Sequence, residues 1–272
     1  MKRLAIYCVT YHSYNELYRF LQSVEEAALR VSSSLTVDVY VADNTDSQIQ
    51  PVSDSCSACH LKVFQLKHNW GYFGAIQKML KQTDVTPYDF VVISNVDLIV
   101  SVDAFEKLLS VKSDESVGWL APKIYSEIEE RDKNPKIIKR YSLDRLRILR
   151  LMYTFPVLHK LYTRTFYKRK KVQRKETVYD GRKIYAGHGS FIILTRSYIS
   201  RCGLPDYPVF LFGEEIYLAE KCRQHGLKVI YEPTIEIRDI EHISTGCLAR
   251  RMYYRYNKEA IEYIIHTFYS KM

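Results

Sequence analysis

The strongest constraint on the fold is a repeating order of short apolar runs and helical patterns in the first third of the chain. Each run is continuously apolar, which is typical of strands that are buried on both faces of a parallel sheet. Between the first two runs, apolar residues such as Leu17, Phe20, Leu21 and Val24 recur at helical spacing. The runs are Leu4–Val9, Thr36–Ala42, Leu61–Leu66 and Phe90–Ser94. This alternation predicts an α/β fold with a mainly parallel central sheet flanked by helices.

Polar residues follow three of these predicted strands, at the edge of the sheet where ligands bind in folds of this kind. The clusters are Thr10–Asn15, Asp43–Ser47 and Asn95–Asp97. Thr10 and Tyr11 would lie where a base or ribose stacks, and the Asp43 carboxylate could accept a hydrogen bond from a ring N–H of a base. Short polar residues after a strand also form ordinary turns, so both interpretations stay open here.

Asn95 and Asp97 form a candidate metal site at the end of the fourth run. An amide oxygen and a carboxylate oxygen at this spacing suit a hard divalent cation that also holds a diphosphate. Such a metal would neutralise the charge on a departing nucleotide. The alternative is that the two residues only form the turn.

Two adjacent carboxylates, Glu214 and Glu215, follow the apolar run Val209–Phe212 and open a helix that is predicted to end near Gly226. One of them could deprotonate an acceptor hydroxyl as a general base, while the other binds the acceptor or the backbone. Acidic residues in the first turn of a helix also have an ordinary explanation, because they compensate the helix dipole.

Two histidines and several glycines are further candidates for binding residues, on weaker grounds. His188 stands between two glycines before the run Phe191–Leu194 and could contact an acceptor or a phosphate, or belong to a loop. His242 follows a predicted strand and is either a further metal ligand or a structural residue. The glycines of the segment 68–75 do not match a phosphate-binding loop, but they could let the backbone approach a ligand.

The charge of the chain indicates which classes of molecule it can bind. Lysine and arginine total 40 against 31 acidic residues, a formal charge of +9, which favours a nucleotide, a nucleic acid or a membrane surface. The start, MKRLAIYCVTY, predicts a strand and not a signal peptide, and no apolar run is long enough for a spanning helix. We therefore expect a cytoplasmic protein with six reduced cysteines. A zinc site at Cys56 and Cys59 is the weaker alternative, because a single CxxC has no second pair.

The segment 126–177 has a different character from the rest of the chain. Its apolar residues from Asp144 to Leu161 have helical spacing, interrupted at Pro156, and basic residues are concentrated from Arg164 to Lys175. A solvated helical face, an element drawn to anionic lipid and a nucleic-acid patch are all compatible with this pattern. The chain is predicted to end in a tyrosine-rich helix within 247–272. We expect one domain over 1–272 that carries this insert and this helix.

The order of these motifs resembles family 2 glycosyltransferases of the GT-A fold, especially the rhamnosyltransferase-like branch that works on bacterial surface polysaccharides. The matching segments are the first strand with Thr10 and Tyr11, VADNTDS at 41–47, HNWGYFGA at 68–75, VVISNVD at 91–97, GHGSFIIL at 187–194, FLFGEEIYLAEKCRQHGLKVIYEP at 210–233, and His242. The resemblance covers nearly all of the chain from residue 2 to residue 246.

The resemblance implies roles for individual residues. Asp97 would end the metal-binding motif, Glu215 would act as the base beside Glu214, and His242 could bind the metal, which would be Mn or Mg. Nucleotide-sugar binding would fall to Thr10, Tyr11, Asp43, Asn44, Asn69, Gly71, Asn95 and His188. Two residues depart from the family pattern: Asn95 replaces the first Asp of the metal motif, and Glu215 stands where Asp is commoner.

The function implied is inverting transfer of a hexose or deoxyhexose from a nucleoside diphosphate sugar to a hydroxyl of a saccharide acceptor. The acceptor would be lipid-linked, in capsule or O-antigen synthesis, and the basic insert would hold the enzyme at the inner membrane face. The alternatives are a catalytically silent nucleotide-sugar-binding protein and a basic nucleic-acid-binding protein, although no recognisable nucleic-acid module is present. A nucleotidylyltransferase would need a glycine-rich loop after the first strand, and none is found there.

Overall fold

The computed structural model describes residues 1–52, 56–112, 114–158, 183–240 and 249–270. The strands are β1 (Lys2–Thr10), β2 (Leu35–Asp43), β3 (His60–Gln65), β4 (Phe90–Asn95), β5 (Leu98–Val100), β6 (Val117–Ser126), β7 (Arg131–Asp132), β8 (Lys183–Ile184), β9 (Phe191–Thr195) and β10 (Lys228–Asp239). The helices are α1 (Tyr14–Leu29), α2 (Tyr72–Leu80), α3 (Ala104–Ser110), α4 (Leu143–Thr154), α7 (Arg196–Cys202), α8 (Glu214–Gln224) and α10 (Arg250–Phe268).

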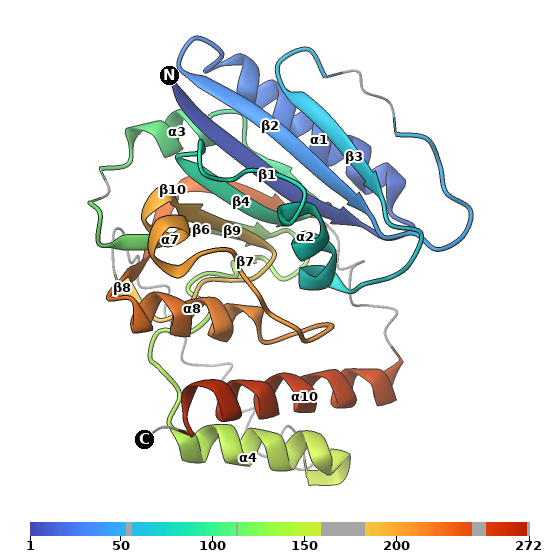
Figure 1. Ribbon diagram of the computed structural model, residues 1–272, viewed down its shortest axis with the longest axis vertical. Helices are drawn as coiled ribbons and strands as arrows, with labels where there is room; N and C mark the ends of the chain where they lie inside the picture. The colour runs from blue at the N-terminus through green and yellow to red at the C-terminus, as the bar shows by residue number, and fades with distance from the viewer. Residues whose placement is uncertain (53–55, 113, 159–182, 241–248, 271–272) are drawn as a thin grey trace.

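One twisted sheet organises the molecule, with strand order β3-β2-β1-β4-β9-β6-β10-β5 (Figure 1). β3, β2, β1 and β4 run parallel, as do β6 and β10, whereas β9 is antiparallel to both of its neighbours. The register pairs Thr10 with Asp43 and Val9 with Asn95. The predicted polar clusters therefore meet at one edge of the sheet, as expected for parallel strands.

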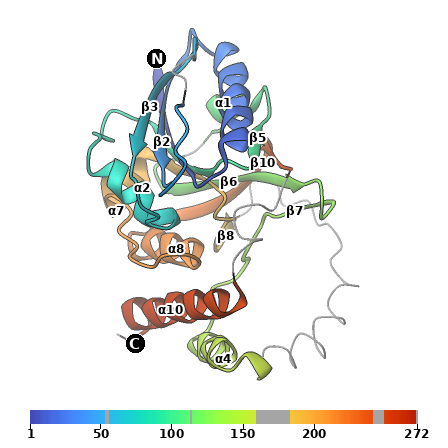
Figure 2. The same ribbon diagram turned by 90° about the vertical axis from the view of Figure 1, so that its right-hand side faces the viewer.

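Helices cover both faces of this sheet, as the side view in Figure 2 shows. α1 and α3 lie on one face, where Leu17, Phe20 and Val24 of α1 are fully buried in one apolar core. The residues of α2, α7 and α8 belong to the core of the other face. α10 packs outside α8, and α4 packs on α10 as the outermost layer. The predicted α/β class with a mainly parallel sheet is confirmed.

The predicted insert is helical only in part. α4 forms where helical spacing predicts it, with Ser142 accepting a hydrogen bond from the Arg145 backbone at 3.2 Å, and it ends before Pro156. The earlier part of the segment joins the sheet through β7 and through a bridge between Ile137 and Ala186. Residues 159–182, which carry the most basic stretch, lie outside the described residues. The C-terminal helix is present as α10, and the division of the chain into a domain with an insert stays a prediction.

One expectation about the cysteines is wrong. Cys56 and Cys59 form a disulfide, with 5.5 Å between their Cα atoms, a distance that a disulfide spans readily. The prediction of reduced thiols failed because it rested on compartment and not on local distance. Both sulfurs are bonded to each other, which also removes the alternative of a zinc site at this pair. Cys8, Cys202 and Cys222 are free and buried, and Cys247 lies outside the described residues.

Candidate active site

Buried polar residues lie at the carboxyl ends of β1 and β2. Asp43 is almost fully buried, and its two carboxylate oxygens accept hydrogen bonds from the Tyr14 hydroxyl at 2.9 Å and the Thr45 backbone at 3.1 Å. Beside it the Thr10 hydroxyl is buried and has no hydrogen-bond partner among the described residues. Tyr11, at the end of β1, is 43% exposed and leaves an aromatic ring at the rim. This arrangement suits the predicted base-binding role of these residues, which stays a prediction.

Asn44, which follows β2, and Asn69 hold the loop that precedes α2 through hydrogen bonds. The Asn44 amide donates to Asn69 Oδ1 at 3.1 Å and to the Gly71 carbonyl at 3.0 Å, and its own oxygen accepts from the Trp70 backbone. Gly71 has a φ of +74°, and a β-carbon there would lie 2.2 Å from the Phe210 carbonyl oxygen, so only glycine fits. Binding of the nucleotide sugar by Asn44, Asn69 and Gly71 stays a prediction; in this structure they hold the loop that leads into α2.

The segment Gly187–Ser190 is the centre of the site, because side chains and backbone from separate elements hold it. The His188 backbone donates to Asn134 Oδ1 at 2.7 Å, and the Tyr72 hydroxyl donates to the Gly189 carbonyl at 3.1 Å. The Asn95 backbone donates to the Ser190 carbonyl at 2.9 Å. The His188 ring lies 2.9 Å from the Ser190 hydroxyl. These contacts bring the end of β4, the start of α2 and the predicted His188 turn together.

Glu214 and Glu215 reach this centre from the first turn of α8. A β-carbon at Gly189 would lie 2.8 Å from Glu214 Oε1 and 3.2 Å from Glu215 Oε1, so both carboxylates lie against this glycine. The backbone before them is unusual: Phe212 has a φ of +69° and Gly213 a φ of +84°. Positive φ at a bulky residue costs free energy and is most often found at functional sites. The predicted helix start is confirmed, and the strained turn aims both glutamates at Gly189.

Burial and neighbouring charges raise the pKa values of two groups at this site, Glu214 and Tyr72. Desolvation, followed by the negative charge of Glu215, raises the pKa of Glu214 to about 8, while Lys136 acts in the opposite direction. The pKa of the Tyr72 hydroxyl is raised well above its ordinary value, first by burial and then by the charges of Glu214 and Asp97. The charges of Asp97 and of both glutamates therefore act on the same hydroxyl, that of Tyr72. A carboxyl whose pKa is raised by burial can hold a proton near neutral pH, which suits acid–base work.

The donor set at Asp97 fits a hard divalent cation in part. Its carboxylate, at the end of the segment after β4, is 7% exposed, and carboxylate and amide oxygens are the ligands that Mg2+ and Mn2+ prefer. In the described part of the chain, no group of three or more His, Cys, Asp or Glu side chains is arranged to hold a metal ion. His242, the other predicted ligand, lies outside the described residues.

Several residues of the site were not predicted from the sequence. Tyr72, Asn134 and Lys136 act on the Gly187–Ser190 segment or on Glu214, yet no motif singles them out. The only available signal was the segment 68–75, in which Tyr72 follows a glycine that was selected. Asn134 is separated from its partner His188 by 54 positions, and local spacing cannot reveal such a contact.

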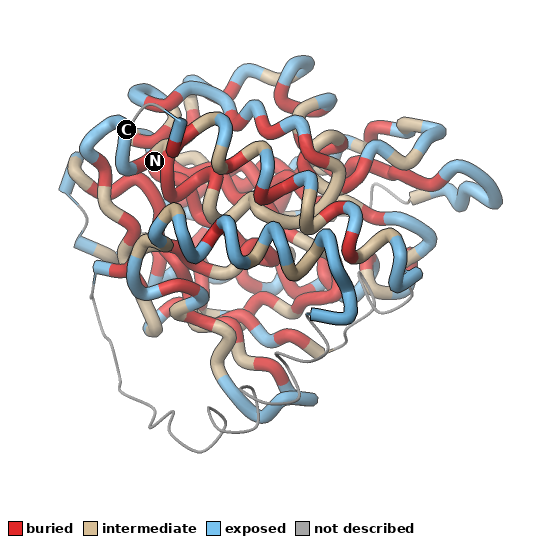
Figure 3. Tube along the Cα trace, turned by 90° about the horizontal axis from the view of Figure 1, so that it is seen from below, coloured by how far each residue is buried: buried red, intermediate tan, exposed pale blue. Residues whose placement is uncertain are grey.

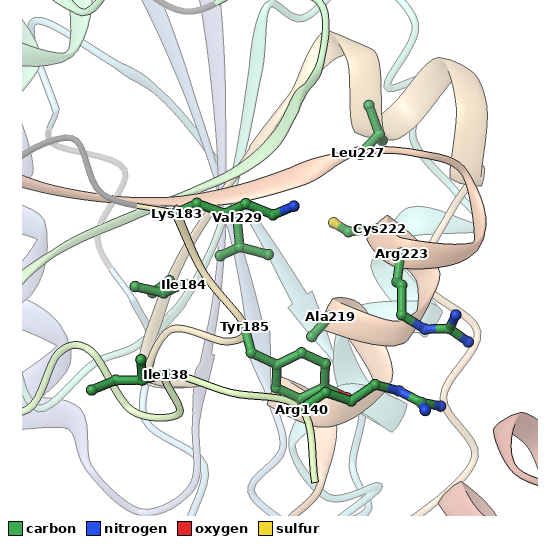
Figure 4. A pocket seen from close by; sticks show the side chains of 10 residues that line it. All are labelled: Ile138, Arg140, Lys183, Ile184, Tyr185, Ala219, Cys222, Arg223, Leu227 and Val229. Atoms are coloured by element: carbon green, nitrogen blue, oxygen red, sulfur yellow. The ribbon is translucent and has the colours of Figure 1, made fainter. Parts of the chain in front are cut away.

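A second pocket lies at the other end of α8 and contains none of the predicted site residues (Figure 4). It has a volume of about 310 Å³, and the cationic residues on its wall are Arg140, Lys183 and Arg223. Arg140 and Arg223 both bind the fully buried Glu220, at 2.6 and 2.8 Å. These ion pairs connect α8, which carries Glu220 and Arg223, to the segment before α4, which carries Arg140.

Comparisons with known proteins agree with this geometry. The family model described as "Glycosyltransferase like family 2" matches residues 3–256. A crystal structure of GalNAc-T7 with UDP, GalNAc and Mn2+ superposes with a TM-score of 0.63 at 11% identity, covering 98% of this chain and 49% of that one. S. aureus TarS superposes with a TM-score of 0.55 at 13% identity, over all of this chain and 44% of that chain.

The chain thus spans about half the length of these two structures; a shorter TarS structure, residues 1–349, is covered to 73%. At these identities the likeness shows the fold alone. A search of curated proteins found no match. Among the described residues, no helix is both long and apolar enough to cross a membrane.

Proposed function

The chain belongs to glycosyltransferase family 2, and we propose that it transfers a sugar, with inversion, from a nucleoside diphosphate sugar to a hydroxyl of a saccharide acceptor. The observation that carries this proposal is the placement of Glu214 and Glu215 against Gly189, whose carbonyl binds the Tyr72 hydroxyl on which Asp97 also acts. It puts a candidate base, a candidate metal ligand and the carboxyl ends of the parallel strands in one place.

The roles follow from the chemistry of each group. Glu215 takes the acceptor proton as the acceptor oxygen bonds to the anomeric carbon, and the bond from that carbon to the diphosphate breaks, leaving its electron pair on the phosphate oxygen. Glu214, whose pKa is raised, stays protonated at neutral pH and donates a hydrogen bond to the acceptor or the backbone. Thr10, Tyr11 and Asp43 bind the base and ribose.

Asp97 would hold a divalent cation, with Asn95 and His242 as further ligands. Mn2+ or Mg2+ bound there supplies charge neutralisation for the departing diphosphate. The use of Mn2+ in the GalNAc-T7 structure supports this assignment for the fold.

We place the enzyme in the rhamnosyltransferase-like branch, with a lipid-linked acceptor in capsule or O-antigen synthesis at the inner membrane face. The motif order supports the branch, and the basic composition supports contact with a membrane and an anionic donor. The donor sugar, hexose or deoxyhexose, is then the first property to measure.

The test is a thermal-shift screen with nucleoside diphosphate sugars, with and without Mn2+ or Mg2+, on the wild type, Asp97→Ala and the control Asp144→Ala. Asp144 is an exposed carboxylate on α4, and its loss leaves the strand ends unchanged. We expect one donor to stabilise the wild type and the control in a metal-dependent way, and Asp97→Ala to lose that shift. No shift with any donor would contradict the proposal, and transfer that is unchanged in Glu215→Gln would favour a role other than base for that residue.

A further inference from the structure

α4 has apolar side chains on two faces, and the described residues cover only one of them. Leu146 is fully buried, and the Tyr153 ring contacts the Tyr253 and Tyr254 rings of α10 at 6.0 and 6.2 Å. Ile148 and Leu151 lie on the side of α4 away from Leu146, and Phe155 and Leu158 follow beyond the end of the helix; the four are 53%, 50%, 53% and 41% exposed. We name these residues the α4 stripe. Ile148 and Leu151 are three positions apart, which places them on one side of the helix.

The charge around the α4 stripe is mostly positive. Arg147 and Arg150 lie beside it on the same helix, and Lys258 of α10 borders the same groove, which has a volume of about 490 Å³. Glu262, 3.9 Å from Lys258, is the acidic residue on the groove wall, and Asp144 pairs with Arg147 at 3.2 Å, so Arg150 carries the positive charge that these two carboxylates leave unbalanced. A large apolar stripe with arginines on its border is typical of helices that lie in the interface plane of a membrane.

The position of α4 makes this face accessible. α4 is the outermost layer at one end of the long axis, beyond α8 and α10 (Figure 1). Viewed from that end, the Cα trace shows a helix of mainly exposed and intermediate residues in front (Figure 3). A flat surface could therefore contact the α4 stripe without meeting the central sheet.

We propose that the α4 stripe, together with Arg147 and Arg150, binds the surface of a bilayer that contains anionic lipid. The apolar side chains would enter the boundary of the acyl chains, and the arginines would lie among the phosphate groups. Two other occupants fit less well. The sequence 164–175 is rich in lysine and arginine and has no acidic residue, so it would meet like charge at this face. A second copy in symmetric contact would likewise bring arginines against arginines.

This surface is connected to the candidate active site through α10. The Tyr253 ring lies 6.0 Å from Tyr153 of α4 and 5.4 Å from Phe212, which directly precedes the α8 turn. Two helices, α4 and α10, would therefore lie between the bilayer and the carboxylates at the start of α8. The inference rests on the proposed function in one respect, because it explains how a lipid-linked acceptor would be held near Glu215.

The experiment is flotation of the full chain with vesicles of phosphatidylcholine alone and of phosphatidylcholine with phosphatidylglycerol. The variants are Ile148→Ser/Leu151→Ser and Arg147→Gln/Arg150→Gln. The matched controls are Leu29→Ser/Val102→Ser, at apolar positions that are 55% and 48% exposed, and Arg196→Gln/Arg238→Gln, at exposed arginines. All these side chains are exposed, and circular dichroism with thermal unfolding confirms that each variant is folded.

We expect the wild type and both controls to bind the anionic vesicles. Each α4 variant should bind about tenfold more weakly, by loss of apolar insertion or of electrostatic attraction. Absence of wild-type binding, or equal binding by the α4 variants, would overturn the inference. So would light scattering that shows a dimer dispersed by Ile148→Ser/Leu151→Ser. Donor binding and transfer to a water-soluble acceptor are measured without vesicles, so failure of the proposed function is seen separately.

Discussion

Replacing Gly189 by alanine should displace the carboxylates of Glu214 and Glu215 while leaving the stability of the fold nearly unchanged. In Gly189→Ala the β-carbon would lie 2.8 Å from Glu214 Oε1, whereas ordinary contact begins at 3.4 Å. The Glu214 oxygen must therefore move by about 0.6 Å, and the Glu215 oxygen, at 3.2 Å, by less. Both atoms are the far ends of flexible side chains, so the movement costs little stability. No charge, hydrogen-bonding group or helix cap is lost.

The expected effect on transfer is much larger than the effect on folding. A displacement of about 1 Å at a reacting group can lower the rate about a hundredfold, so a shift of about half that size predicts a fall of about tenfold or more in kcat/KM. A tenfold fall corresponds to about 1.4 kcal/mol of transition-state stabilisation. The free energy of unfolding should change by less than about 1 kcal/mol.

Steady-state kinetics and urea unfolding on three alanine variants provide the measurement. Gly74→Ala is the control for the substitution itself, because its β-carbon would meet only Trp70 Cβ, at 3.4 Å, within α2. It should keep full activity and gain up to about 1 kcal/mol of stability. Gly187→Ala is the control for packing, because its β-carbon would lie 2.6 Å from Ala121 Cβ in the core, and it should unfold more easily.

Two results would refute the reasoning. Wild-type kinetics in Gly189→Ala would show that transfer does not depend on where the carboxylates lie against this glycine. A loss of stability as large as that of Gly187→Ala would show that the Glu214 and Glu215 side chains cannot move aside. Any loss of activity would then reflect a damaged fold.

Three further predictions concern charge and hydrogen bonding. The raised pKa of Glu214 means that this carboxyl ionises at lower pH in the unfolded chain, so its contribution to stability should fall as pH rises from 4.5 to about 8, and Glu214→Gln should reduce that slope in thermal unfolding. Asn134→Ala removes the acceptor for the half-buried His188 backbone N–H, and urea unfolding should show a loss of about 2 kcal/mol. Burial alone would raise the pKa of Glu220, but hydrogen bonds, led by that from Arg140, outweigh it and lower the pKa. Stability should therefore fall as pH drops below 4.5, and Glu220→Gln should make this fall smaller while costing about 3 kcal/mol at neutral pH.

The sheet was predictable because its physical cause is local. A strand such as β1, with Leu4 to Cys8 fully buried, must be apolar at consecutive positions, and that pattern is visible without any knowledge of its neighbours. The polar ends of β1, β2 and β4 could be grouped from the same reasoning, since parallel strands end at one edge. The start of α8 at Glu214 was predictable for a similar reason, because acidic residues favour the first turn of a helix.

The contacts that shape the site could not be read in this way. Tyr72 binds the Gly189 carbonyl across 117 positions, and one hydroxyl among 23 tyrosines carries no local mark of that contact. The disulfide between Cys56 and Cys59 was missed because composition indicates a compartment and says nothing about the distance between two sulfurs. The antiparallel course of β9 between β4 and β6 is likewise a property of the whole sheet.

The tyrosines of α10 have a function that neither pattern nor composition assigns. The Tyr207 hydroxyl donates to the Phe212 carbonyl at 2.7 Å, and the Tyr207 ring packs on Tyr263 of α10 at 5.3 Å. A β-carbon at Gly213 would lie 2.5 Å from the Tyr207 hydroxyl and 3.0 Å from Ala260 Cβ, so α10 closes on the turn that precedes the carboxylates. A turn with positive φ at Phe212 keeps its strained backbone only while such contacts hold it. A force that moves α10, including contact of α4 with a bilayer, would therefore act on the geometry of Glu214 and Glu215 through this turn.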